Sequence, residues 1–357
     1  MMPMYVRQIL AVLRLELKKT FFARRGLWVY LVALAPALLY VGQDIEGPRH
    51  QKQLEQINRQ HPLEPYKLAN VTKGQTKQQV IALLGRPYSQ RGPFGRPGRI
   101  QREIDWYTDG KREIMVEITD GLVTNVDPSG PPTIEGQTIV FATLFQNVYL
   151  RLGVFFGCIG IFANLFRGEM LDKSLHYYLL TPMPREVLVA GKFLAGLLVM
   201  CAIFCSGTTL QFAAMLGQFD RSVALNFLHT GGSAMLWSYV GVTLLACVAY
   251  GSLFVALGLL FRNPVVPAAF VLMWESIVMF MPVSLKELSI IYYLQCICPV
   301  AATVDKSMPA VLKMLVTSDS DPVTRRAAIV MLLAVSTVCL GIAAFRGRRL
   351  EINYAVE

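Results

Sequence analysis

Two ionisable side chains inside long apolar stretches are the first candidates for chemistry. Arg151 interrupts the stretch 145–166, and Glu275 interrupts the stretch 264–283. A charge at membrane depth is costly, so such a residue usually marks a functional site. Counted from the basic residues that end the two stretches, they would lie roughly 24 and 20 Å deep. We expect Arg151 and Glu275 to pair or to line a substrate cavity. The alternatives are a purely structural ion pair and an Arg151 that snorkels to the outer surface.

The charged segment 166–192, which joins two apolar stretches, offers a second candidate site. Its first half predicts a short amphipathic helix with apolar side chains on or near one face, namely Met170, Leu171, Leu175, Tyr178 and Leu179. Pro182 and Pro184 end this helix, and the next apolar stretch follows at once. A helix held so closely against a membrane could pass force from a cytoplasmic partner into two spans. The alternative is a solvated amphipathic loop without a partner.

Several catalytic and cofactor motifs are missing from the sequence. Gly191-Lys192 lacks an upstream glycine and is followed by Phe193, so it is not a phosphate-binding loop of the type Gly-x-x-x-x-Gly-Lys-Ser/Thr. The four histidines are dispersed, Cys296 and Cys298 have the wrong spacing for a zinc site, and no Gly-x-Ser-x-Gly elbow occurs. We therefore expect no catalytic residue, cofactor or metal in this chain, and we expect that it is not an enzyme.

Membrane helices are the elements that would position these residues. Hydrophobic residues make up 54% of the 357 residues and charged residues only 16%, whereas soluble proteins carry about 25% charged residues. Six stretches reach or approach the roughly 20 apolar residues that a membrane helix needs. They are 26–41, 145–166, 193–218, part of 222–261, 264–283 and 327–345. The sequence thus predicts an all-α polytopic membrane protein with six transmembrane helices.

Basic residues indicate how these helices are oriented. Fourteen Lys and Arg residues lie before the first stretch, between the second and third, between the fourth and fifth, and after the sixth. Both termini are therefore predicted to be cytoplasmic, with 1–25 as an amphipathic lead helix and 346–357 as a tail. This asymmetry accounts for most of the net charge of +10, so we expect no nucleic-acid partner. Residues 288–316 are expected at the outer interface or re-entering the membrane.

Residues 42–137, between the first two predicted spans, have a different composition. They hold 13 basic and 12 acidic residues, so they predict a small extracytoplasmic domain inserted into the membrane protein. Thr76 is a plausible N-cap for a helix over 77–84, which Gly85 would end. Asp-Gly turns at 109–110 and 120–121 separate three apolar runs, which predicts a three-stranded meander, and 92–98 is expected to be a loop. The domain is therefore predicted to be of the α+β class.

This inserted domain resembles the SmpA/OmlA small-lipoprotein domain of the outer-membrane assembly machinery. The resemblance covers about 60 residues and is carried by Gly74-Gln75-Thr76, Leu83-Leu84-Gly85-Arg86-Pro87, Trp106-Tyr107 and the Asp120-Gly121 hairpin. It implies a periplasmic module that binds envelope proteins and does not imply catalysis. The lipid-anchored cysteine of that family is absent here, and a folded spacer without a ligand is the alternative.

The rest of the chain resembles the ABC-2 type transporter permease family. The motif residues are Glu169, the run Leu179-Leu180-Thr181-Pro182, Arg185 and Gly191-Lys192. The basic lead helix, the insertion after the first span and the six spans agree with the same family. The resemblance implies that 168–182 is a coupling helix. Its docking residues on an ATP-binding subunit would be Glu169, Met170, Leu171, Leu175, Tyr178, Leu179 and Arg185.

The resemblance also implies which partners the chain has and in which membrane it lies. ATP and Mg would be bound by the separate ATP-binding subunit, and a second permease subunit, identical or different, would complete a dimer. The chain would lie in the bacterial inner membrane as the permease subunit of an exporter, with 26–41 as its first span and 138–345 as the five-helix remainder. A membrane-anchored envelope scaffold that acts through 42–137 is the alternative function, and an integral-membrane enzyme is the third.

Overall fold

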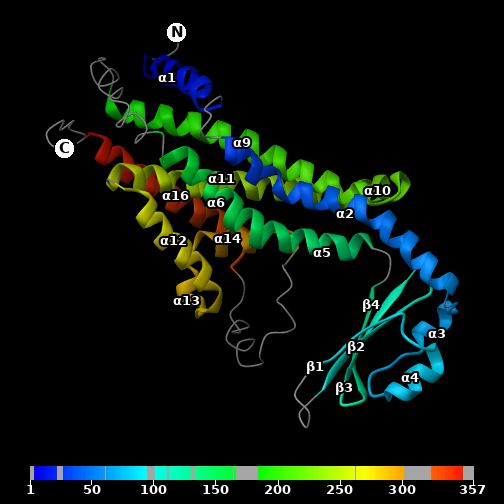
Figure 1. Ribbon diagram of the computed structural model, residues 1–357. Coiled ribbons are helices and arrows are strands. Elements are labelled where there is room, and N and C mark those ends of the chain that lie inside the picture. The colour runs from blue at the N-terminus through cyan, green and yellow to red at the C-terminus, as the bar shows by residue number, and fades with distance from the viewer. Residues whose placement is uncertain are drawn as a thin grey trace. The chain divides into compact units, whose positions relative to one another are not determined.

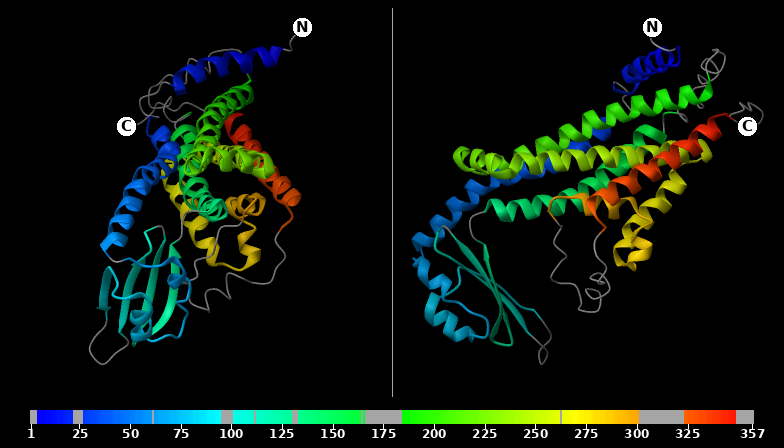
Figure 2. Two further views of the ribbon diagram at one scale, coloured as in Figure 1. Left: turned by 90° about the vertical axis from the view of Figure 1, so that its right-hand side faces the viewer. Right: turned by 180° about the vertical axis from the view of Figure 1, so that it is seen from behind.

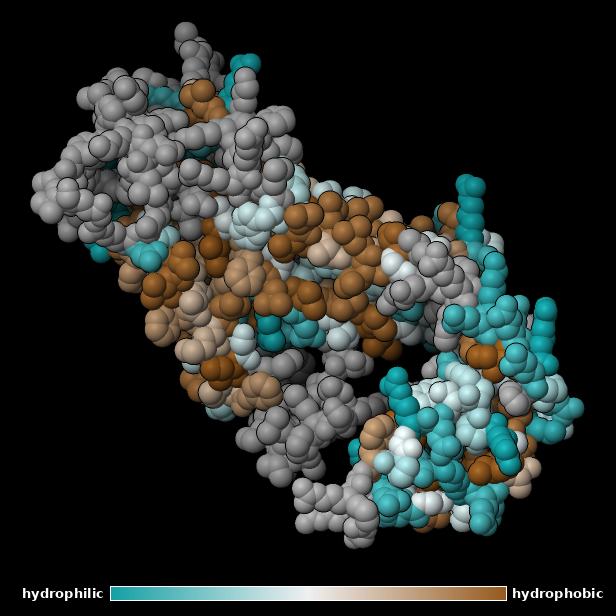
Figure 3. All heavy atoms as spheres, in the orientation of Figure 1, coloured by the Kyte–Doolittle hydropathy of each residue, from teal (hydrophilic) through white to brown (hydrophobic). Residues whose placement is uncertain are grey.

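The computed structural model describes residues 4–21, 27–60, 62–94, 101–110, 112–129, 133–163, 165, 184–261, 263–300 and 323–348. The chain divides into two compact units. We call Met1–Tyr40 together with Gln137–Glu357 the membrane body, and Val41–Gly136 the inserted unit. Figure 3 shows apolar side chains gathered over the membrane body and polar side chains over the inserted unit.

The described part of the membrane body consists of helices and the short segments that join them (Figure 1). In chain order its helices are α1 (Met4–Phe21), the first part of α2 (Leu27–Gln60), α5 (Ile134–Leu144), η2 (Phe145–Val154), α6 (Phe155–Cys158), η3 (Ile159–Ala163), α9 (Arg185–Gly217), α10 (Arg221–Phe227), η4 (Leu228–Gly232), α11 (Ser233–Leu260), α12 (Val265–Ile277), η5 (Val278–Phe280), α13 (Val283–Lys286), α14 (Ile290–Ile297) and α16 (Arg325–Arg348). The long helices α9, α11 and α16 run side by side in both views of Figure 2.

Four helical segments are long and apolar enough to cross a membrane. They are Ile134–Phe162, Arg185–Gly217, Arg221–Leu260 and Arg325–Arg348. The first and fifth predicted spans correspond to shorter apolar helices, Trp28–Gly42 and Val265–Ile277. The chain is thus a mostly helical protein with four candidate membrane spans, and the six-span arrangement stays a prediction.

Small residues allow the helices of the membrane body to approach closely. The Tyr149 hydroxyl donates to the Phe204 carbonyl oxygen at 2.6 Å and lies over Gly207, where a side chain would collide with it. The Thr208 and Thr243 hydroxyls, 2.9 Å apart, join α9 to α11. These contacts satisfy polar groups inside an otherwise apolar core.

The described part of the inserted unit contains the second part of α2, one antiparallel sheet and two short helices. The sheet has the order β1 (Ser89–Phe94), β2 (Arg102–Thr108), β3 (Glu113–Thr119) and β4 (Leu122–Ser129), and the helices are α3 (Pro65–Ala69) and α4 (Lys77–Leu84). The predicted helix 77–84 is confirmed, and the Thr76 side chain accepts from the Gln79 backbone N–H in a capping box. An apolar cluster that includes Val80, Tyr107 and Val116 forms the core of this unit.

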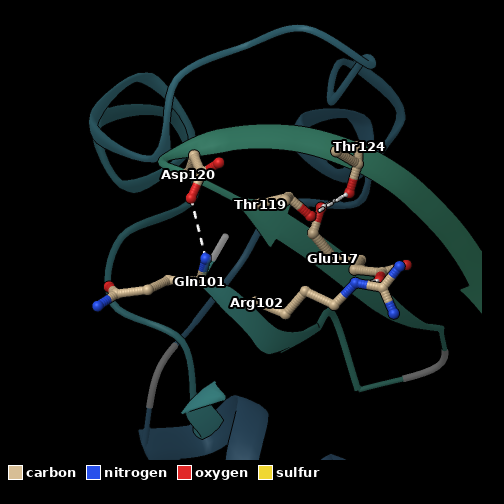
Figure 4. Close-up of polar contacts among 6 residues, drawn as sticks. All are labelled: Gln101, Arg102, Glu117, Thr119, Asp120 and Thr124. Atoms are coloured by element: carbon tan, nitrogen blue, oxygen red, sulfur yellow. Dashed lines mark hydrogen bonds and ion pairs between the residues drawn. The ribbon is translucent and has the colours of Figure 1, made fainter. Parts of the chain in front are cut away.

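The sheet has four strands rather than the predicted three. Residues 92–94, which were predicted to begin a loop over 92–98, are the last residues of β1, which pairs with β2. The prediction missed this strand because Gly92 and Pro93 are poor strand formers. Both Asp-Gly turns are confirmed, with positive φ at Gly110 and Gly121. Figure 4 shows the polar contacts around the second turn: Asp120 Oδ1 accepts from the Gln101 N–H at 2.9 Å, and Arg102 pairs with Glu117 at 3.3 Å.

Helix α2 does not end where the first predicted span ends. It begins at Leu27 and continues without a break to Gln60, well past Val41. Residues 51–60 consist mainly of Gln, Lys, Glu, Arg and Leu, which are good helix formers. The composition changes from apolar to polar at residue 42, but the helix does not end there.

Candidate functional site

The lead helix α1 packs against the beginning of α9. Val12 of α1 is buried, and its Cγ1 lies 3.0 Å from the position that a Cβ on Gly191 would occupy. The carbonyl oxygen of Ile9 lies 3.6 Å from the same position. Glycine at position 191 is therefore what lets the two helices approach this closely.

A buried ion pair joins the same two helices one turn further along. Lys192 Nζ donates to Glu16 Oε1 at 2.8 Å, and the two side chains are 0% and 3% exposed. Lys192 Nζ also donates to the Leu165 carbonyl oxygen at 3.2 Å. One ammonium group thus holds the lead helix α1, helix α9 and Leu165, the described residue that directly precedes 166–183.

Two further contacts connect the start of α9 with the end of α16. Arg185 donates to the Arg348 carbonyl oxygen at 3.0 Å, and Arg348 pairs with Glu186. Both arginines and the glutamate are solvent-accessible, so these contacts contribute little stability. They nevertheless bring the basic C-terminal turn of α16 to the end of the body where α1 meets α9, as Figure 2 shows.

Of the predicted coupling residues, only Arg185 lies in the described part of the chain, at the first turn of α9. Glu169, Met170, Leu171, Leu175, Tyr178 and Leu179 lie outside the described residues. The segment that contains them is bounded on both sides by the contacts above, because Leu165 precedes it and Arg185 follows it.

Glu275, on α12, uses its carboxylate to hold the beginning of α14. Its side chain is 2% exposed and accepts from the Ser289 hydroxyl and from the backbone N–H groups of Ile290 and Ile291, at 3.0 and 3.2 Å. These are two of the N–H groups that the first turn of a helix cannot satisfy internally. Glu275 is therefore an N-cap supplied by a neighbouring helix, with the carboxylate at the favourable end of the helix dipole.

Arg151, on η2, lies close enough to Glu275 for an electrostatic interaction. No ion pair between the two is present among the interactions of the described residues, and Arg151 Nε is buried without a hydrogen-bond partner. The hydroxyl of Tyr250, which also interacts electrostatically with both groups, is likewise buried without a partner. The structure thus brings Arg151 and Glu275 into one polar region, where the carboxylate oxygens contact α14.

Sequence reasoning missed the pairing of Glu16 with Lys192. Lys192 entered the sequence analysis as a cytoplasmic basic residue and as part of the Gly191-Lys192 motif, and no partner was predicted for it or for Glu16. A signal was available, since Lys192 follows Gly191 inside a run that is otherwise apolar from Val187 to Ile203. A lysine in such a run is expected to have a buried partner.

The contacts of the candidate site connect helices that are far apart in the sequence. They link the lead helix, the start of α9 and the end of α16, and they fix α14 through Glu275. Within the ranges that the structure describes, no three His, Cys, Asp or Glu side chains converge to hold a metal ion.

Comparison with known proteins assigns the family. The sequence matches the family described as "ABC-2 family transporter protein" over residues 10–346. No curated protein and no solved structure matches. The match extends from within the lead helix to within the fourth candidate span and includes the inserted unit, so the chain belongs to the ABC-2 transporter family of membrane proteins.

Proposed function

We propose that this chain is the permease subunit of an ABC-2 type exporter, driven by ATP hydrolysis on a separate ATP-binding subunit. The family match along 10–346 carries the proposal, because it spans the membrane helices and the lead helix together. Proteins of this family generally work with an ATP-binding subunit, which would also hold ATP and Mg. In this proposal the chain itself has no enzymatic activity and binds no cofactor.

The coupling site of the proposed permease is the segment 168–182. Its neighbours on both sides are held: Leu165 accepts from Lys192, and Arg185 donates to the end of α16. The contact of Leu165 with the buried Lys192 gives the segment a fixed entry, so a push from a docked subunit would pass into α9. The docking residues would be the predicted set, namely Glu169, Met170, Leu171, Leu175, Tyr178, Leu179 and Arg185.

The proposed substrate cavity lies at Arg151 and Glu275. Arg151 supplies a buried Nε donor that has no acceptor among the described residues, which is the kind of group a substrate oxygen would satisfy. Glu275 would act as a positioning residue, because its oxygens hold α14 in place. Both side chains interrupt apolar segments, where ionisable residues usually have a functional role.

We further propose that the protein is a multi-pass protein of the bacterial inner membrane with six spans and cytoplasmic termini. The inserted unit would then face the periplasm as an SmpA/OmlA-like module that contacts envelope proteins. Two such permease chains, identical or different, would form the transport unit. The apolar surface of the membrane body in Figure 3 is consistent with burial in lipid and against a second subunit.

Co-purification with a matched pair of variants tests the proposal. The tagged chain is purified in mild detergent from its native host, and an ATP-binding subunit is expected to accompany it in stoichiometric amount. Leu175→Asp should abolish this association because it places a charge on the apolar docking face. Leu288→Asp, the same change at a 72%-exposed leucine beyond α13, should leave it intact. A chain that arrives without an ATP-binding subunit would refute the proposal.

The scaffold function is the second candidate, and one observation favours it. The inserted unit has its own apolar core and its own compact contacts, as expected of a module that folds and binds independently. If the scaffold function is correct, activity survives Glu169→Ala and Leu175→Asp but is lost on deletion of 50–127. The permease proposal expects loss of transport in the first two variants.

A further inference from the structure

The inserted unit buries an ionisable side chain that has no hydrogen-bond partner among the described residues. Asp105, in the middle of β2, is 0% exposed, and neither of its carboxylate oxygens accepts a hydrogen bond from the described part of the chain. Two residues further along the same face of β2, Tyr107 is also 0% exposed, and its hydroxyl has no partner. Buried polar groups are normally satisfied, so an ionised Asp105 would carry a large desolvation cost here.

The surroundings of Asp105 do not compensate a negative charge. On β3 its register partner is Val116, and on β1 its register partner is the uncharged Gln90. From α4, Lys77 attracts the carboxylate, but the Lys77 ammonium is already paired with Glu103.

Glu103 lies on the same face of β2 as Asp105 and repels it. The Lys77 ammonium is thus paired with Glu103 and not with Asp105. Burial, the largest effect, and the repulsion from Glu103 raise the pKa of Asp105, while Lys77 only partly offsets this.

We propose that Asp105 is a proton-binding site that controls the order of the inserted unit. With a proton bound, Asp105 is a neutral group that β2 can bury beneath α4, next to the Tyr107 hydroxyl. When the proton leaves, the carboxylate must gain water, and a loosening of β2 against α4 admits that water. The unit is therefore tightly packed at acidic pH and looser at alkaline pH.

The direction follows from linkage. The folded-state pKa of Asp105 lies above the unfolded-state pKa, so the folded form binds the proton more tightly. The resulting stability is complete below the unfolded pKa, which is about 4, and it is lost as the pH rises through the folded pKa. Each unit of pKa shift changes the opening equilibrium of the unit about tenfold.

Hydrogen exchange of the full-length protein in detergent tests this inference. Protection factors of β2 and β3 amides are measured at pH 5 and pH 8, after correction for intrinsic exchange. In the wild-type chain we expect lower protection at pH 8 than at pH 5. Asp105→Asn should remove this pH dependence and raise protection at pH 8. Glu55→Gln, at an exposed position of α2, is the matched control and should keep the wild-type dependence.

Two further variants keep the result decisive. Asp105→Val replaces the carboxyl group by a good strand former and should also be independent of pH. Lys77→Met removes the attraction that favours the ionised form, so the transition should move to higher pH. An Asp105→Asn chain with the wild-type pH slope would overturn the inference. So would equal loss of protection in Asp105→Asn and Asp105→Val at pH 5, because the carboxyl group would then be making a stabilising contact.

Discussion

The buried pair between Glu16 and Lys192 gives the sharpest prediction for the membrane body. In Lys192→Met the side-chain volume stays similar, but the buried carboxylate of Glu16, 3% exposed, loses its contact with the Lys192 ammonium. Removing one partner of a buried ion pair costs about 3–5 kcal/mol. Glu16 is relieved of this cost when it takes up a proton or when α1 leaves α9 and exposes the carboxylate. At a pH where the carboxylate stays ionised, the undocked population of α1 should rise roughly 10²- to 4 × 10³-fold.

Amide hydrogen exchange over α1 in the full-length protein measures this undocking. We expect the exchange of α1 amides in Lys192→Met to accelerate by that factor, while α11 and α16 keep their protection. Arg14→Met is the matched control, because it makes the same change at an exposed position of α1. In the double variant Glu16→Gln/Lys192→Met no buried charge remains, so exchange should return to within a few-fold of wild type. Unchanged exchange of α1 in Lys192→Met would refute this reasoning.

Three other predictions concern local contacts. Gly191→Leu should displace α1, because its Cβ alone would meet Val12 Cγ1 at 3.0 Å, and trypsin should then cleave within α1 faster. Glu275→Leu should expose the first turn of α14 to exchange, because it removes the carboxylate that accepts from the N–H groups of Ile290 and Ile291. Glu275→Gln keeps an acceptor oxygen and should retain most of the protection. Thr76→Ala should lower the unfolding free energy of the inserted unit by about 1 kcal/mol, as read from denaturant-dependent exchange.

Features that depend on neighbouring residues in the sequence were predictable. The helix 77–84 and both Asp-Gly turns follow from capping and turn chemistry, which acts within four residues. Strand β1 was not predicted because its residues gain their conformation from pairing with β2, and Gly92 and Pro93 mask the pattern. The continuation of α2 beyond Val41 was also not predicted. A change from apolar to polar residues marks the end of an apolar stretch, but it does not mark the end of a helix.

The candidate sites show the same division between local and tertiary information. The sequence identified Glu275 as an unusual charge in an apolar stretch, but it did not identify the donors to its carboxylate. These donors come from α14, and no sequence pattern predicts that α14 packs against α12. Glu16 and Lys192 are 176 residues apart, and only the packing of α1 on α9 makes them partners. A charge in an apolar run indicates that a partner exists, whereas the identity of that partner requires the fold.

The position of Lys192 explains why an ion pair, and not an apolar contact, suits this place. Its ammonium has three donors, of which one contacts Glu16 and another contacts the Leu165 carbonyl oxygen. An apolar side chain could pack against α1 but could not hold a backbone carbonyl at the end of η3. Because Leu165 immediately precedes the proposed coupling segment, one side chain fixes both the lead helix and the entry to that segment. Under the proposed function, a push on residues 168–182 would therefore reach α1 and α9 together. Lys192→Met should accordingly weaken transport more than it weakens binding of the ATP-binding subunit.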